Sequence, residues 1–247
     1  MPAFFPLPHV EDCHKRIRAY ICGVCLIDTR KAKLVWLHHH YPTYFVLKDD
    51  LPLSWYLSVA STTDTETIYN VSAGGAPYDE KTRGAVILYL TGPLQGLALI
   101  KFSAMDAWFE EDEEIFIHPK DPYKRIDILQ SSRHVRIEVN GIEIANTRAP
   151  RLLFETGLPV RTYIPKTDCR MDLWVPSMTQ TGCPYKGMAN YYNVVLSSGE
   201  TFRDIVWVYP NTTAEASAIR GFVAFFDEKV DVWVDGEKQS PPQTGYN

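Results

Sequence analysis

Arg136-Ile-Glu-Val-Asn-Gly-Ile-Glu-Ile-Ala-Asn-Thr-Arg148 is the stretch of sequence that indicates the fold most directly. Apolar and polar residues alternate on both sides of Asn140-Gly141. Such alternation is typical of strands with one buried face, and Asn-Gly is a strong signal for a two-residue hairpin turn. The stretch therefore predicts a β-hairpin.

The same pattern occurs earlier in the chain, in Arg18-Ala-Tyr-Ile-Cys-Gly-Val-Cys-Leu-Ile-Asp-Thr-Arg30. Arg, Gly, Thr and Arg recur at a constant offset, which is 118 residues between Gly23 and Gly141. The same offset continues as far as Asp50 and Asp168, and further on Trp108 is aligned with Trp207. So many anchors in one order predict an internal duplication.

The repeat predicts an all-β protein of two tandem domains, each made of antiparallel sheets, packed on each other as a pseudo-dimer and with few short helices. We expect residues 1–13 to form an N-terminal arm and residues 14–130 the first domain. Residues 131–237 are expected to form the second domain, and residues 238–247 a loose C-terminal tail. Only Thr213–Arg220 has a helical pattern.

Composition limits the classes of partner. The formal net charge of −5 gives no electrostatic reason to expect a nucleic-acid partner. No apolar run approaches the roughly 18 residues that span a bilayer, so we expect no membrane partner. Five cysteines, an odd number, without a secretory signal favour a cytoplasmic protein with reduced thiols. The expected partner is a small organic molecule.

The densest group of reactive residue types lies in residues 182–187, where glycine and proline indicate a tight loop. This loop would present Cys183, Tyr185 and Lys186. A cation beside a cysteine stabilises the thiolate, and a tyrosine and a lysine can donate protons or hold an oxyanion. The structural alternative is a buried cysteine under a turn, with Lys186 in solvent.

Glu155 is the second catalytic candidate, because it follows the apolar run Leu152–Phe154 and is expected to be partly buried. A buried carboxylate is either paired or has a raised pKa, and both suit a general acid or base. Arg148 and Arg161 are possible partners. A purely structural Glu–Arg pair is the alternative.

The repeat allows these candidates to be compared with a sister copy. Reactive residues of the second domain align with residues of other chemistry in the first: Glu155 with Leu37, Cys183 with Ala76 and Lys186 with Asp79. In contrast, Pro184-Tyr185 matches Pro77-Tyr78. We therefore expect the functional site in the second domain, at its own pocket or at the groove between the domains.

Further polar and aromatic residues are candidates for substrate binding. Arg170 and Asp172 are two apart in a stretch expected to be extended, so their side chains would share a face. The full set of expected binding residues is Arg161, Arg170, Asp172, Tyr191, Trp207 and Tyr209. In the first domain, His38 and His40 have the spacing of two metal ligands on one strand, but no third ligand can be assigned.

The second repeat resembles the family called domain of unknown function 427. The matching motifs are Leu153-Phe-Glu-Thr-Gly-Leu-Pro159, Arg170-Met-Asp-Leu173, Cys183-Pro-Tyr-Lys-Gly-Met-Ala-Asn-Tyr191, Trp207-Val-Tyr-Pro210 and Val230-Asp-Val-Trp-Val-Asp-Gly236. The resemblance implies a β-tent fold, as in methionine sulfoxide reductase B, in which two antiparallel sheets meet along one edge. The first repeat looks like a divergent copy of a tandem member, with Leu37 where the family usually has Glu.

These features lead to three functional hypotheses. The first is a cofactor-independent enzyme, an isomerase, cyclase, lyase or hydrolase, that uses acid–base or thiol chemistry through Glu155, Cys183, Tyr185 and Lys186. It predicts that Glu155→Gln and Cys183→Ala each abolish turnover while changing stability by less than about 1 kcal/mol. The alternatives are a non-enzymatic module that binds a small ligand or peptide, and a metal-dependent enzyme at His38 and His40.

Overall fold

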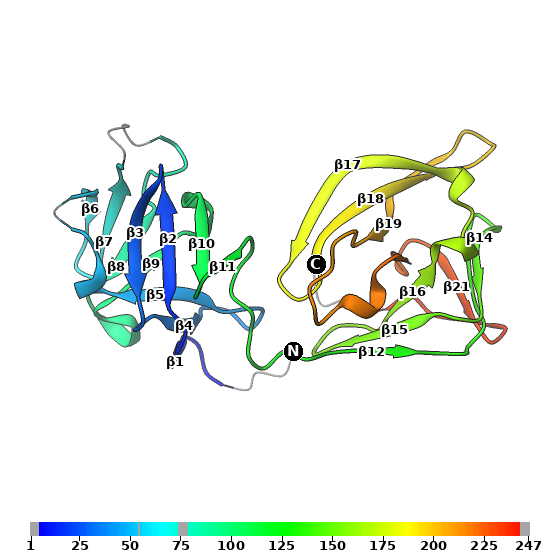
Figure 1. Ribbon diagram of the computed structural model, residues 1–247, viewed down its shortest axis with the longest axis horizontal. Coiled ribbons are helices and arrows are strands. Elements are labelled where there is room, and N and C mark those ends of the chain that lie inside the picture. The colour runs from blue at the N-terminus through cyan, green and yellow to red at the C-terminus, as the bar shows by residue number, and fades with distance from the viewer. Residues whose placement is uncertain (1–4, 54, 74–78, 243–247) are drawn as a thin grey trace. The chain divides into compact units, whose positions relative to one another are not determined.

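The computed structural model describes residues 5–53, 55–73 and 79–242, and the chain divides into two units, Met1–Asp121 and Pro122–Asn247 (Figure 1). Each unit contains one seven-stranded and one four-stranded sheet, and neighbouring strands pair antiparallel. The prediction of an all-β protein with duplicated antiparallel sheets is confirmed. How the two units pack together stays a prediction.

The first unit consists of a large seven-stranded sheet and a small four-stranded sheet. Its large sheet has the spatial order β1 (His9–Asp12), β4 (Lys33–Trp36), β5 (Thr43–Leu47), β9 (Leu97–Ile100), β8 (Val86–Tyr89), β7 (Glu66–Val71) and β6 (Leu57–Thr62). Its small sheet has the order β11 (Glu113–Ile115), β10 (Ala107–Glu110), β2 (Ile17–Ile21) and β3 (Val24–Thr29).

The second unit repeats this arrangement strand for strand. Its large sheet has the order β12 (Ile126–Gln130), β15 (Arg151–Glu155), β16 (Arg161–Pro165), β20 (Phe222–Phe225), β19 (Thr201–Val208), β18 (Gly187–Val195) and β17 (Trp174–Cys183). Its small sheet, given in the direction that matches the first unit, has the order β22 (Glu237–Lys238), β21 (Asp231–Val234), β13 (Val135–Val139) and β14 (Ile142–Thr147).

Local details of the two units also match at the predicted offset. In the β2–β3 turn Cys22 and Gly23 have φ of 48° and 74°, and in the β13–β14 turn Asn140 and Gly141 have φ of 49° and 74°. Two successive positive φ angles are typical of the type I′ hairpin that Asn-Gly predicts. Cys22 and Cys25, whose spacing resembles that of a zinc knuckle, therefore lie at the tip of a hairpin.

A hydroxyl–carboxylate hydrogen bond also occurs in both units. Thr29 Oγ1 donates to Asp50 Oδ2, and Thr147 Oγ1 donates to Asp168 Oδ2, both at 2.6 Å. Each bond ties the end of a small-sheet strand to a 3-10 turn after the large sheet's third strand. Because both copies keep it, this bond belongs to the architecture of the fold.

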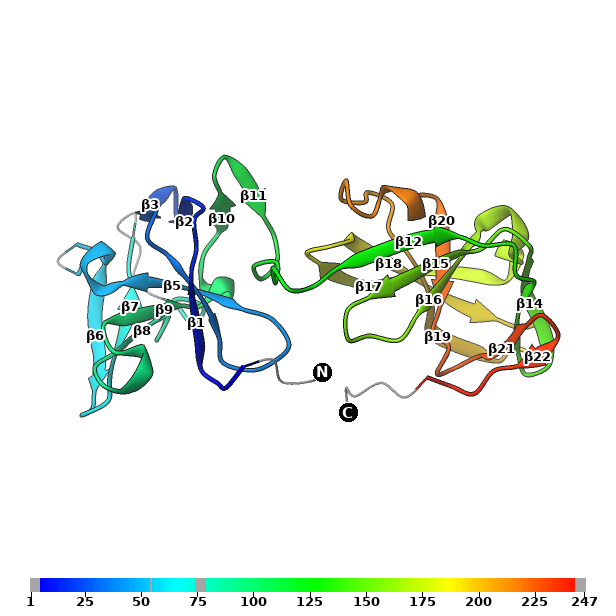
Figure 2. The same ribbon diagram turned by 90° about the horizontal axis from the view of Figure 1, so that it is seen from below.

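The boundary between the units lies earlier than the sequence analysis placed it. Residues 126–130, assigned to the first domain, form β12 and pair with β15 of the second (Figures 1 and 2). Likewise, the expected N-terminal arm contains β1, which pairs with β4. Each unit thus begins with an edge strand of its own large sheet, and the link lies near residues 122–125.

The second half of the predicted repeat alignment is wrong. Trp108 lies on β10 of a small sheet, whereas Trp207 lies on β19 of a large sheet, and β10 corresponds to β21 in the sheet order. Strand register instead aligns Ile87 with Trp207. Ile87 pairs with Leu99, which pairs with Phe45. In the second unit Trp207 pairs with Ala224, which pairs with Tyr163, the residue at the constant offset from Phe45. Ala76, Pro77 and Tyr78 lie outside the described residues. Short motifs misled the alignment because the connecting loops differ in length.

The hairpin between β17 and β18 is longer than its counterpart. In the first unit the pair Thr62↔Thr67 encloses residues 63–66, while the corresponding pair Gln180↔Asn190 encloses residues 181–189. Both Cys183 and Lys186 lie in this extension. The first unit therefore has no position equivalent to either residue.

Helical structure is limited to short 3-10 turns in the described part of the chain. They are η1 (Lys48–Asp50), η2 (Gly92–Leu94), η3 (Phe102–Ala104), η4 (Lys166–Asp168), η5 (Met171–Leu173) and η6 (Ser217–Ile219). The helix expected at Thr213–Arg220 is reduced to η6, and Thr213 at the start of this stretch donates its backbone N–H to the carbonyl of Lys186. Over the same residues, no helix has the length and apolar character to cross a membrane.

The second unit has apolar packing on both faces of its large sheet. Ile164, Val206 and Val223 face the small sheet and form the main core with residues such as Ile137 and Val232. Their sequence neighbours Tyr163, Trp207 and Ala224 face the other way, where Ala216 and Ile219 of the η6 segment cover them. Side chains of successive strand residues point to opposite faces, so one sheet supports both clusters. The candidate site lies on this second face.

Candidate functional site

Glu155 and Lys186 form an ion pair that is almost fully buried. Lys186 Nζ lies 2.6 Å from Glu155 Oε2, and the two side chains are 12% and 4% exposed. Glu155 is the last residue of β15, and Lys186 lies in the extended β17–β18 hairpin. A buried ion pair needs good geometry to offset the loss of hydration, and its charges are screened little by solvent.

The Lys186 loop is fixed by backbone contacts to the segment after β19. Lys186 N–H donates to the carbonyl of Cys183, which closes a turn with Pro184 at its second position. Gly187 has φ of +112° and pairs with Thr212, and a Cβ at Gly187 would lie 2.4 Å from the carbonyl oxygen of Asn211. A glycine is required here by conformation and by space.

The ion pair borders a cavity of about 240 Å³ on the outer face of the large sheet. Its walls combine three charged side chains with an aromatic surface: Glu155, Leu158, Pro159, Arg161, Lys186, Tyr191, Trp207, Tyr209 and Phe226. We call this space the Glu155 cavity. An apolar pocket with a few convergent polar groups is the usual form of a small-molecule site.

Two tyrosines beside the ion pair retain their protons. Burial is the main cause that raises the pKa values of the Tyr163 and Tyr209 phenols. Tyr163 OH accepts a hydrogen bond from Trp207 Nε1 at 3.3 Å. Burial alone would lower the pKa of Lys186, but its neighbours Cys183, Glu155 and Tyr163 together raise it. The site therefore holds a fixed ammonium group next to neutral phenols.

Arg161 contributes the third charge of the Glu155 cavity and is itself held in place. Its two terminal nitrogens donate to both carboxylate oxygens of Glu228, at 3.0 and 2.6 Å. Asp227 lies further away, with 3.6 Å between Oδ2 and Arg161 Nη1. The guanidinium carbon is 5.8 Å from the centre of the Trp207 ring. This fork geometry orients Arg161 towards the cavity.

The Asp227 carboxyl group is expected to make stability depend on pH. Burial raises its pKa from 3.8 to about 6 in spite of Arg161. A raised pKa means that the folded state prefers the protonated form, so stability present below pH 3.8 is lost as pH rises through 6. The shift corresponds to at most about 3 kcal/mol.

The change in the free energy of unfolding caused by Asp227→Asn should therefore be more favourable at about pH 7.5 than at about pH 4. The difference between the two pH values should be about 1–3 kcal/mol in the free energy of unfolding, measured with urea. An equal effect of the substitution at both pH values would contradict the raised pKa. Asp172→Asn serves as control, because that carboxylate is exposed and its pKa is lowered by Arg170.

The corresponding face of the first unit is apolar. Strand register places Phe45, Ile87 and Ile68 where the second unit has Tyr163, Trp207 and Tyr191. The constant offset places Leu37 at Glu155 and Thr43 at Arg161. Val35, Phe45, Leu94 and Leu97 form a buried cluster there. The fold can thus be completed at this position without charged residues.

The structure brings most of the predicted site residues together, and these are Glu155, Lys186, Arg161, Tyr191, Trp207 and Tyr209. Tyr185 does not line the cavity, because its side chain is 5% exposed and packs near Lys124. Cys183 is also outside the lining and packs against the outer apolar cluster. Both residues shape the loop that carries Lys186.

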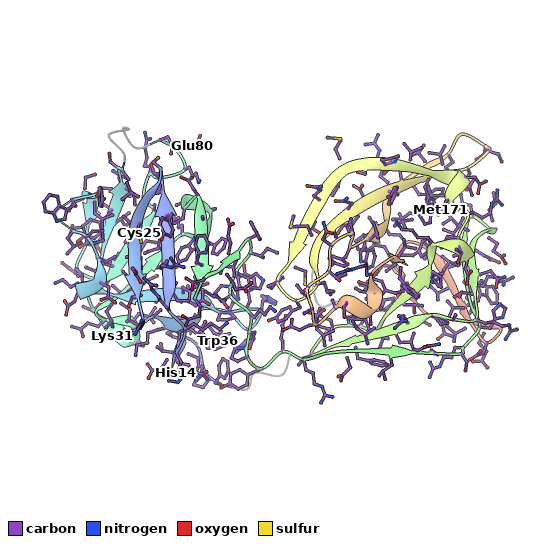
Figure 3. The ribbon with its side chains drawn as sticks, in the orientation of Figure 1. His14, Cys25, Lys31, Trp36, Glu80 and Met171 are labelled. Carbon is purple, nitrogen blue, oxygen red and sulfur yellow. The ribbon has the colours of Figure 1, made fainter. Side chains whose placement is uncertain are left out.

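Arg170 and Asp172 are not part of this site. They bind each other at 2.7 Å on the surface, and both side chains are more than half exposed. The stretch is not extended as expected, because Met171–Leu173 forms a 3-10 turn that Arg170 precedes. Figure 3 labels Met171, which lies between them at the periphery of the second unit. They do not line the Glu155 cavity, and their expected role in substrate binding stays a prediction.

The candidate histidines of the first unit lie beside other aromatic rings. His38 and His40 lie in bends, with ring centres 5.3 Å apart, and the rings of Tyr41 and His118 stack at 3.9 Å. Among the described residues, no group of three or more His, Cys, Asp or Glu side chains is placed to hold a metal ion. The extended strand on which the two-ligand hypothesis depended is absent at these positions.

Several lining residues escaped sequence analysis. Leu158, Pro159 and Phe226 line the cavity, Tyr163 lies behind it, and Glu228 anchors Arg161. Tyr163 follows the ordinary alternation of a strand and Phe226 comes directly after one, so neither gives a signal for a cavity. Only a comparison of Tyr163 with Phe45 at the constant offset could have drawn attention to a hydroxyl in this apolar row.

Together these observations define a duplicated, all-β protein in which the second unit carries a buried ionic pair beside an aromatic cavity. Residues 127–236 match the family model described as Domain of unknown function (DUF427). The second unit therefore carries a domain that matches this family, and the resemblance seen in the sequence is confirmed for that unit. A search of curated proteins finds no match to the chain.

Proposed function

We propose that the second unit binds a small organic molecule in the Glu155 cavity and catalyses an acid–base reaction on it without a cofactor. The observation that carries this proposal is the buried Glu155–Lys186 pair on a cavity wall, at a face that is apolar in the first unit. Burying two charges costs free energy that the same fold avoids in its sister copy. A gain in function accounts for that cost.

The proposed chemistry follows from the charge of each group. Glu155 would take a proton from the substrate and later return it, since a carboxylate is the only basic side chain on the wall. Lys186 remains protonated and would stabilise negative charge that develops on a substrate oxygen. The phenol of Tyr209 would donate a hydrogen bond to the same region. Isomerases, cyclases, lyases and hydrolases all use such steps.

Aromatic walls suggest how the substrate is held. Tyr191, Trp207 and Phe226 offer ring faces, and the Tyr191 hydroxyl is fixed by Thr181 Oγ1 at 2.8 Å. Arg161 could bind an anionic or carbonyl group. A flat or partly apolar molecule with one polar end suits this lining. The net charge of −5 favours such a partner over nucleic acid.

Thiol chemistry receives less support than acid–base chemistry. Cys183 packs against the outer apolar cluster and does not line the Glu155 cavity. Under the proposal it shapes the turn before Lys186. A non-enzymatic binding module is the second candidate, favoured by the fact that Glu155, Lys186 and Arg161 already have protein partners.

The proposal is tested by incubating the protein with pooled small metabolites and following the pool by mass spectrometry. We expect at least one compound to be converted, and Glu155→Gln to slow its conversion roughly 100-fold, because the base is lost. Glu237→Gln, at an exposed glutamate of the same unit, should convert it at the wild-type rate.

Two outcomes would contradict the proposal. Saturable binding of a compound that the wild-type protein leaves unchanged would favour the binding module. Equal conversion by wild type and Glu155→Gln would place the reaction elsewhere.

A further inference from the structure

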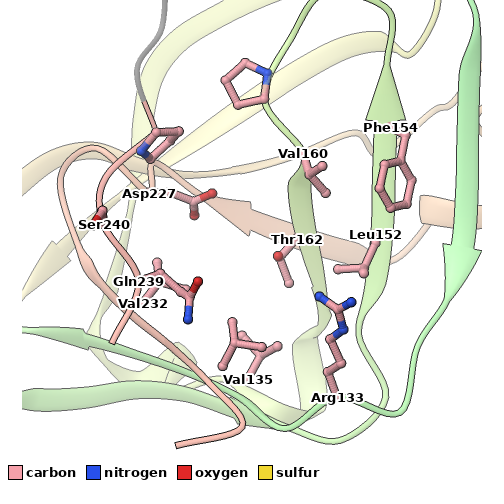
Figure 4. Close-up of a pocket in the computed structure, with 13 residues that line it drawn as sticks. Arg133, Val135, Leu152, Phe154, Val160, Thr162, Asp227, Val232, Gln239 and Ser240 are labelled. Carbon is pink, nitrogen blue, oxygen red and sulfur yellow. The ribbon is translucent and has the colours of Figure 1, made fainter. Parts of the chain in front are cut away.

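A second cavity of about 280 Å³ lies in the second unit, between its large and its small sheet (Figure 4). It opens between the large sheet, through β15 and β16, and the small sheet, through β13 and β21. Its walls are mainly apolar side chains: Val135, Leu152, Phe154, Pro159, Val160, Val232, Val234 and Pro242. The polar lining comes from Arg133, Thr162, Asp227, Gln239 and Ser240. We call it the Asp227 cavity.

Asp227 is poorly compensated for a buried carboxylate. Its side chain is 14% exposed, and Arg161, at 3.6 Å, is the one basic group within 4 Å among the residues that the structure describes. That guanidinium already gives both terminal nitrogens to Glu228 at shorter distances. Two carboxylates thus share one cation, and the second is directed into an apolar space. A carboxylate in such surroundings gains free energy from any further positive charge.

The other charged group on the wall lies apart from Asp227. Arg133 is exposed, and Figure 4 shows it on the opposite side of the cavity. The described part of the chain contains no ion pair between the two residues within 4 Å. The space between them is lined by side chains such as Thr162 and Val232. The cavity therefore has one end that favours a cation, and an apolar middle.

We propose that the Asp227 cavity is a second ligand site, which binds a small organic amine through an ion pair between its ammonium group and Asp227. The apolar walls would surround the body of the amine. The volume suits a compact ligand, because small-molecule pockets are usually about 300–1,000 Å³. Hydrogen bonds between an ammonium group and a carboxylate are stronger than those between neutral groups. Asp227 would therefore bind an amine more tightly than a neutral molecule of the same shape.

This inference does not depend on the proposed reaction. Leu158, Lys186 and Trp207 line the Glu155 cavity and not the Asp227 cavity, whereas Val135, Val232 and Ser240 line the Asp227 cavity and not the Glu155 cavity. Pro159 lines both. Binding at either cavity can be located by which set of residues responds, so each proposal can fail without the other.

The test compares benzylamine with its neutral analogue benzyl alcohol by calorimetry and by chemical shifts of the backbone amides at about pH 7.5. We expect benzylamine to bind at least about tenfold more tightly than benzyl alcohol and to shift Thr162 and Val232 rather than Lys186. Asp227→Asn should lower the affinity for benzylamine about tenfold or more and leave benzyl alcohol unchanged. Asp172→Asn, at an exposed carboxylate, should bind as wild type.

A second variant guards against a general effect of Asp227→Asn on folding. Val160→Trp places a large side chain at a half-exposed wall position and leaves Asp227 intact. It should remove the binding of both ligands. For wild type, lowering the pH to about 5 should weaken benzylamine binding, since Asp227 gains a proton there while Arg161 stays charged and Glu228 stays ionised.

The inference is overturned by any of three results. These are equal affinities of wild type for the amine and the alcohol, undiminished amine binding by Asp227→Asn, and amine-induced shifts confined to the Glu155 cavity.

Discussion

Lys186→Met is expected to destabilise the second unit by about 3–5 kcal/mol, because it leaves the Glu155 carboxylate buried without its cation. The Glu155 side chain is 4% exposed, so water cannot replace the lost ammonium group. The first unit indicates how to restore stability, since it has Leu37 at the position of Glu155. Glu155→Leu combined with Lys186→Met should recover most of the loss, as replacing both members of a buried pair by apolar residues often does.

Urea unfolding of wild type, both single variants and the double variant measures this coupling. Additive effects of the two substitutions would mean that the pair contributes nothing as a pair. The same reasoning changes one expectation from the sequence. Glu155→Gln was expected to alter stability by less than about 1 kcal/mol, but it leaves Lys186 without a carboxylate, so a loss above that value is now expected.

Gly187→Ala is expected to cost at least about 3 kcal/mol and to displace the loop that carries Lys186. The φ angle of +112° is one that L-residues rarely adopt, and the new methyl group would lie 2.4 Å from the Asn211 carbonyl oxygen. A backbone oxygen cannot rotate away as a flexible side chain can. Relief therefore requires the β17–β18 hairpin to separate from residues 211–213.

Gly199→Ala provides the matched control, in a turn of the same large sheet. Its φ of +85° is also positive, but nothing lies within 4 Å of the added Cβ. Conformational strain alone should then cost about 1 kcal/mol. Thermal unfolding of both variants checks the comparison, and equal losses at the two glycines would show that the contact with Asn211 has no effect.

The first half of each repeat was predictable because its signals are local. Asn140-Gly141 fixes a hairpin, and the offset of 118 residues holds as far as Asp168 because no insertion interrupts it. Beyond that point the hairpin after β17 is five residues longer than its counterpart, and the offset changes. Strand pairing distant in sequence then decides the alignment, and single-chain patterns do not report it.

The candidate site was partly predictable for a related reason. Glu155 and Lys186 stood out as charged residues in apolar or glycine-rich surroundings, but their pairing depends on β15 and the β17–β18 hairpin meeting on one face. Arg170 lies away from the Glu155 cavity, because a 3-10 turn replaces the extended stretch that the sequence predicts. The prediction that the second unit carries the site now rests on the position of Lys186 in an extended hairpin, and no longer on its alignment with Asp79.

The order of strands has a consequence for how each unit folds. In both, the edge strand of the large sheet and its neighbour are separated by 20 residues, 13–32 and 131–150, which form the hairpin of the small sheet. When the edge strand pairs with its neighbour, the residues between them are closed into a loop, and this closure costs chain entropy. Formation of the hairpin within these residues shortens the loop that remains to be closed. Contacts of this kind raise the contact order, and such topologies fold on the millisecond-to-second scale. We expect each unit to acquire its edge strand late, after its β-hairpin has formed.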